Sequence, residues 1–227
     1  MNLTFPSVGR TFVGVLGLLI ALAAPTPARA DTVFLVGGAD FSDSTNNTGG
    51  NIAITISDIL GGVEIDILNS LLDPGAFISA LYLNTTSAPL TSPSLVCTDC
   101  ADTNNVAPTG SFGSNAFKGG PDGFFDIRLL FDTTEANRLT PGDSITLQIL
   151  SSTAGFNAAS FESLSAPAGG PGPFLAVAHL QSLPPDGEGS DWVTTTPPTV
   201  IPEPTTLSLL GMGLVGAALR RRRRTSR

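Results

Sequence analysis

Strict alternation of apolar and polar residues is the feature that most constrains how this chain folds. Apolar residues occupy every second position in segment 52–56 and again in segment 63–67. A period of two places those side chains on one face of a β-strand. Gly61-Gly62 lies between the two segments and is a turn signal, so they are predicted to pair as a β-hairpin.

Shorter segments of the same kind extend along the chain. Further strands are predicted at residues 32–36, 77–83, 125–131 and 145–149, at Phe161, and at residues 174–180. Two helical pieces are also expected, a turn at Asn69 to Leu72 and a short helix at Thr134 to Leu139. About seven to nine short strands joined by Gly, Pro and Asn turns predict an all-β fold, an antiparallel β-sandwich of jelly-roll-like type.

The N-terminal 30 residues have the pattern of a secretory signal peptide. Arg10 precedes the apolar run Phe12 to Ala24, and Ala28-Arg29-Ala30 follows it. A basic start, an apolar centre and small residues two positions apart mark export and cleavage. We therefore expect cleavage after Ala30, with Asp31 as the first residue of the mature protein.

The C-terminus combines a stiff turn, an apolar run and a basic block. Pro202, Glu203 and Pro204 are followed by an uncharged run of 15 residues, 205–219. As a helix this run is roughly 22 Å long against a hydrocarbon core of about 30 Å, and snorkelling arginines extend its reach. It is predicted to be a single transmembrane helix, with residues 220–227 as a cytoplasmic stop. The arginines of this stop are Arg220, Arg221, Arg222, Arg223 and Arg224. For so short a run, the alternative is a buried core helix with a basic end.

This order of Pro-Glu-Pro, short membrane segment and arginine block resembles the PEP-CTERM sorting signal of Gram-negative bacteria. The resemblance implies an exported protein, carried by the Sec machinery and held in the inner membrane until an exosortase cuts near Pro-Glu-Pro. Residues 179–192 also resemble, loosely, the closing strand and acidic turn of PEP-CTERM ectodomains. The layout expected is an ectodomain at 31–193 and a proline- and threonine-rich linker at 194–204.

The predicted exported part is strongly acidic. All 19 acidic residues lie between Asp31 and Glu203, where only Lys118, Arg128 and Arg138 are basic, which gives a net charge of −16. Such a surface attracts cations and repels anionic polymers. Nucleic-acid binding is excluded, because phosphate contacts need clusters of lysine and arginine.

The two cysteines, Cys97 and Cys100, form a C-x-x-C motif. In an oxidising compartment they are expected to form a local disulfide that fixes a loop. Redox activity is the alternative, although no thioredoxin-like pattern surrounds the motif. A metal site would need two further ligands, which the neighbouring sequence does not offer.

Two acidic loops are candidates for Ca²⁺, which prefers closely spaced oxygen ligands. The residues concerned are Asp40, Asp43, Asp186, Glu188 and Asp191. Neither loop has the EF-hand pattern. Solvated acidic turns without a metal are the alternative, and no other cofactor is expected.

His179 is the only histidine, so a multi-histidine metal site is impossible. A Ser/His/Asp triad would have to use it, yet no G-x-S-x-G elbow is present. A structural or surface histidine is therefore expected.

Two classes of function remain after these exclusions. The first is a non-catalytic surface or matrix protein that is incorporated into extracellular polysaccharide or a biofilm. The second is a carbohydrate-binding module or glycoside-active enzyme on a jelly-roll frame. Only Trp192 and Tyr82 offer polar aromatic side chains for sugars, and this favours the first class.

Overall fold

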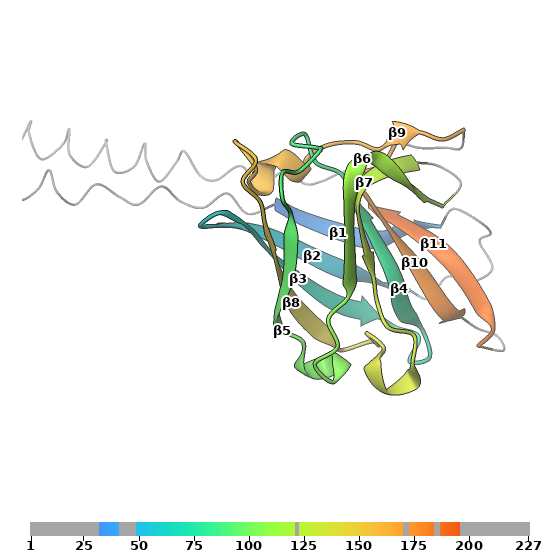
Figure 1. The fold of residues 1–227 in the computed structure, drawn as a ribbon. Coiled ribbons are helices and arrows are strands. Elements are labelled where there is room, and N and C mark those ends of the chain that lie inside the picture. Colours follow the sequence, from blue (N-terminus) through green and yellow to red (C-terminus); the bar gives the residue numbers. More distant parts are fainter. Residues whose placement is uncertain (1–31, 41–48, 121–122, 170–172, 184–186, 196–227) are drawn as a thin grey trace, which may run out of the picture.

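The computed structural model describes residues 32–40, 49–120, 123–169, 173–183 and 187–195. These residues form a β-sheet with three short 3₁₀ helices (Figure 1). The strands are β1 (Thr32–Asp40), β2 (Gly50–Ile59), β3 (Gly62–Leu71), β4 (Phe77–Leu83), β5 (Ser94–Asp99), β6 (Thr109–Gly119), β7 (Gly123–Leu130), β8 (Ser144–Leu150), β9 (Ala166–Pro167), β10 (Ala176–Leu183) and β11 (Gly189–Thr195). The helices are η1 (Ala101–Thr103), η2 (Glu135–Asn137) and η3 (Ala158–Phe161).

The described strands belong to one continuous antiparallel sheet. Its order is β5-β8-β3-β2-β1-β11-β10-β4-β7-β6, and the short β9 pairs with β7. The prediction of an all-β antiparallel fold is confirmed. The two halves of the predicted sandwich, β5-β8-β3-β2 and β11-β10-β4-β7-β6, are not separate sheets, because β1 joins them by hydrogen bonds. In Figure 1 the two halves curve toward each other, and the edge strands β5 and β6 come into contact.

The curved sheet encloses one hydrophobic core. Alternate residues of β2, β3 and β8 face those of β4, β7 and β10, and Ile54, Ile65, Leu147, Ile127 and Leu180 are all fully buried. Because both halves contribute the same kind of side chain to one core, neither half could bury its apolar face without the other. The alternation read from segments 52–56 and 63–67 is confirmed, since β2 and β3 pair as a hairpin across Gly61.

Strand β1 joins the two halves. It pairs with β2 over Thr32–Val36 and with β11 through Val36, Ala39 and Asp40, with a shift of register after Val36. Gly37 lies in this bulge with φ of +136°. A Cβ there would lie 3.0 Å from the carbonyl oxygen of Gly50, so the bend requires glycine.

Three local expectations are corrected by the structure. Asn69 to Leu72 does not form a helical turn, because β3 continues to Leu71 and Asn69 Nδ2 donates to the carbonyl oxygen of Leu139. Phe161 is not in a strand but at the end of η3, where Asn157 Oδ1 accepts from the backbone N–H of Ser160. The helix expected from Thr134 is only the single turn η2.

Strand β11 also affects the domain boundary. It runs to Thr195, so Thr194 and Thr195, which the sequence analysis assigns to the linker, are part of the sheet. Both are buried, and Thr194 Oγ1 donates to the carbonyl oxygen of Ala176. The sheet therefore continues to within a few residues of Pro202 in the sequence.

Substituting Gly37 by alanine tests whether its bend controls the fold. Gly37→Ala should lower the free energy of unfolding by about 3 kcal/mol or more, because a strained φ is combined with a backbone clash. Gly155→Ala is the matched control, since its φ is +78° but nothing lies within 4 Å of a Cβ; it should cost about 1 kcal/mol. Equal losses in urea unfolding of the two variants would contradict the role given to Gly37.

Candidate functional site

The sorting motif is the first candidate site, and it lies outside the described residues. The same holds for the signal-peptide cleavage residues Ala28, Ala30 and Asp31, and for the arginine block that begins at Arg220. In the described part of the chain, no helix combines the length and the apolar character that a membrane crossing requires. The described residue that comes closest before the motif in the sequence is Thr195, at the end of β11.

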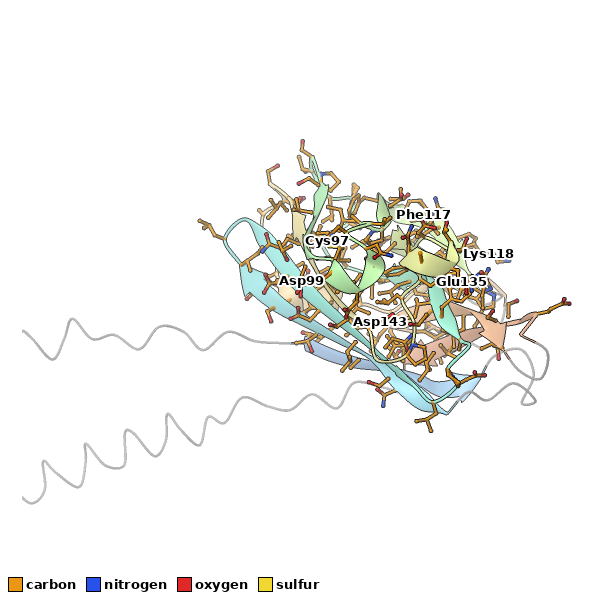
Figure 2. All side chains as sticks on the ribbon, turned by 90° about the horizontal axis from the view of Figure 1, so that it is seen from below. Cys97, Asp99, Phe117, Lys118, Glu135 and Asp143 are labelled. Carbon is orange, nitrogen blue, oxygen red and sulfur yellow. A yellow bond between two sulfur atoms is a disulfide. The ribbon has the colours of Figure 1, made fainter. Side chains whose placement is uncertain are left out.

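Cys97 and Cys100 form the expected disulfide in the described structure. Cys97 lies on the edge strand β5, and the carbonyl oxygen of Cys100 accepts from the N–H groups of Thr103 and Asn105. Figure 2 labels Cys97 and Asp99 on β5, and Phe117 and Lys118 near the end of β6. Because the ring closes over only two intervening residues, its stabilisation should fall at or below the low end of the ~2–4 kcal/mol range.

The acidic loops are described only in part. Asp43 and Asp186 lie outside the described residues, as does the side chain of Asp40. The backbone of Asp40 pairs with Val193, so both loops meet the sheet at the same end of the β1–β11 pair. Asp191 is 2% exposed, and its Oδ1 accepts from the Trp192 N–H at 2.6 Å. Glu188 is exposed.

No group of three or more His, Cys, Asp or Glu suited to a metal occurs among the described residues. With two of the five proposed ligands outside that part of the chain, calcium binding stays a prediction.

His179 lies in a cluster on the outer face of β4, β10 and β11. Its Nδ1 is 2.7 Å from Ser79 Oγ, and the same hydroxyl donates to the His179 carbonyl oxygen at 3.0 Å. A serine has one hydroxyl proton, so Nδ1 donates to Oγ in the tautomer in which the hydroxyl donates to the carbonyl oxygen. Ser79 is buried, and its contacts with both the ring and the backbone of His179 connect β4 to β10.

Aromatic rings continue this cluster. The His179 and Trp192 ring centroids are 4.5 Å apart, and those of Trp192 and Tyr82 are 5.5 Å apart. Tyr82 is 7% exposed, and burial raises the pKa of its hydroxyl despite the opposing effect of Arg128. A Cβ on Gly120 would lie 3.2 Å from the Trp192 ring, so backbone covers part of that ring. Sequence reasoning named these rings separately but could not bring them together.

A polar cavity of about 300 Å³, which no sequence pattern predicted, lies beside the end of β10 and the start of β11. It draws residues from four separate segments, among them Phe77, Arg138, Gln181 and Ser190. The sequence offered one indication of this cavity. Basic residues are rare in the acidic part of the chain, and Arg138 is one of only three there.

A scan against protein-family models matches residues 200–224 to the PEP-CTERM protein-sorting motif. The chain carries a PEP-CTERM sorting signal. This motif marks an exported, membrane-anchored protein of Gram-negative bacteria that is targeted to an exosortase. Neither the search of curated proteins nor the search of solved structures gave a match. The comparisons therefore concern the tail alone. The role of the β-sheet domain has to be inferred from its own residues.

The protonation of His179 gives a test of the cluster. Burial lowers its pKa below the ordinary 6.5, so the folded protein keeps this ring neutral. The unfolded chain then takes up more protons as pH falls below about 6.5, and the free energy of unfolding should fall until the folded-state pKa is reached. His179→Gln should lack this component in urea unfolding between about pH 5.5 and 7.5.

The single histidine also gives an unambiguous NMR titration. A midpoint below 6.5 is expected. A midpoint at or above that value would mean that the ring is not buried against Trp192 as described.

Proposed function

We propose that this chain is an exported, non-catalytic protein of the cell surface or extracellular matrix. Its β-sheet domain is displayed after an exosortase removes the membrane segment. The observation that carries the proposal is the sorting motif at residues 200–224, which begins five residues after the end of β11 at Thr195. Cleavage near Pro202–Pro204 would thus release the described sheet with all of its strands.

The proposed route uses three partners. The Sec machinery exports the chain and its residues 1–30 are removed, the inner membrane holds residues 205–219, and the exosortase cuts near Glu203. The arginine block keeps the tail in the cytoplasm, because arginine-rich flanks favour that side. The destination that we propose is an exopolysaccharide or biofilm matrix.

A non-catalytic role is supported by the contacts of the described polar groups. Ser79 and His179 satisfy each other and the backbone. The glycan-platform alternative on a jelly-roll frame needs flat, open aromatic faces. Tyr82 is buried, and Trp192 is partly buried, with the His179 ring and Gly120 close to its indole, so neither ring is a fully open platform.

Calcium binding at the two acidic loops remains part of the proposal. Neutralisation by Ca²⁺ would reduce the self-repulsion of a domain with a net charge of −16. A rise in melting temperature beyond that given by ionic-strength-matched sodium chloride would support it, and identical curves would reject it.

Processing in the native host tests the main proposal. Intact-mass measurement of surface material should show a chain that begins at Asp31 and lacks Arg220–Arg224. Replacing Pro202-Glu203-Pro204 by alanines should leave a membrane-bound precursor, because the stiff segment that the exosortase recognises is lost.

Alanine replacement of Pro197-Pro198 is the matched control, since it removes two prolines from the same linker and should leave processing intact. Surface material that retains the arginine block in the presence of the exosortase would overturn the proposal.

A further inference from the structure

A cavity beside the end of β10 and the start of β11 is a candidate binding site on the described surface. Its volume is about 300 Å³, at the lower end of the range for small-ligand pockets. The walls come from the start of β4, the segment after η2, the end of β10 and the start of β11. At its rim, Glu188 and Ser190 are exposed, so the cavity is accessible from solvent.

Arg138 is held in place on one wall. Its guanidinium carbon lies 4.2 Å from the centroid of the Phe77 ring, which is itself 2% exposed. Its Nε donates to the carbonyl oxygen of Thr133 at 2.9 Å. Stacking and this hydrogen bond orient the planar group, so little conformational entropy remains to be lost when a ligand binds.

Strands β10 and β11 supply neutral hydrogen-bonding groups to the cavity, beside Phe77, which pairs with Gln181. Gln181 and Ser190 are directly paired on β10 and β11 and both line the cavity. Ser182 follows in a bulge with φ of +61°, where the register of the two strands shifts. Bulges of this kind redirect side chains at sheet ends. The cavity thus combines the donors of Arg138 with amide and hydroxyl groups and the carboxylate of Glu188.

Charge restricts the class of ligand. The net charge of −16 in the predicted exported part opposes the approach of anions. The guanidinium of Arg138, always protonated, opposes the binding of a cation in the same space. A neutral ligand remains, and the lining favours one with several hydroxyl groups that both donate and accept hydrogen bonds.

We propose that this cavity binds one sugar unit of a neutral polysaccharide, with Arg138 and Glu188 hydrogen-bonding its hydroxyl groups. The open rim lets the polymer continue outside the cavity. This inference rests on the proposed surface or matrix function and names the partner by which the displayed domain would be retained. It does not use the aromatic rings of Tyr82 and Trp192.

Binding is tested on the full-length chain, purified in detergent from a host that lacks exosortase. Neutral gluco-, galacto-, manno- and xylo-oligosaccharides are titrated by calorimetry, with polygalacturonate as the anionic comparison. At least one neutral series should bind. Arg138→Gln should weaken that binding about tenfold or more, and Glu188→Gln several-fold, because each removes charge-assisted hydrogen bonds.

Lys118→Gln is the matched control, since it changes the net charge by the same amount on the exposed part of β6, and it should bind as the parent does. Glu188 is exposed, so its variant is expected to fold even if Arg138→Gln is destabilised, and melting temperatures are compared for all three.

Absence of binding to every neutral series overturns the inference. So does a preference for polygalacturonate, or binding that both cavity variants leave unchanged. The sorting proposal is judged separately, by the mass of the processed chain in the native host, so the two can fail independently.

Discussion

The pairing of β1 with both β2 and β11 is the interaction on which the rest of the structure depends. It turns two groups of strands into one hydrogen-bonded sheet and brings their apolar faces together round one core. The bend requires a backbone conformation that only glycine adopts easily, and Gly37 supplies it with φ of +136°. Without that bend, the isoleucine faces of β2 and β3 would lose the strands that cover them.

This closure has a consequence for export. The first and last described strands lie side by side in the middle of the sheet, so the fold is complete only when the chain is free to pair as far as Thr195. The sorting motif begins five residues later, which places the proposed cut close to the folded domain in the sequence but outside its described strands. On the proposed route, processing would leave all of the described strands in the displayed domain.

Local patterns predicted the strands in which apolar and polar residues alternate. They failed where long-range contacts determine the secondary structure. The 52–67 hairpin was predictable because its period and its glycine turn are both local. Strands β5 and β6 were missed because nearly all of their residues are exposed or only partly buried, with Gly, Ser and Thr between the few apolar ones. At Phe161, capping by Asn157 overrides the β-propensity of the aromatic ring. The tail was recognisable from its own residues, whereas the cavity joins Phe77, Arg138 and Gln181 from distant segments, which no spacing rule connects.

Hydrogen exchange of the exported domain tests most directly whether closure by β1 and β11 holds the fold together. If it does, the paired amides of β1 and β11 should exchange as slowly as those of the β2–β3 hairpin, since all would open only with the whole sheet. Processed and unprocessed chains should give the same pattern, because the cut lies beyond Thr195. Fast exchange confined to β1 and β11, with β2 and β3 still protected, would contradict the account.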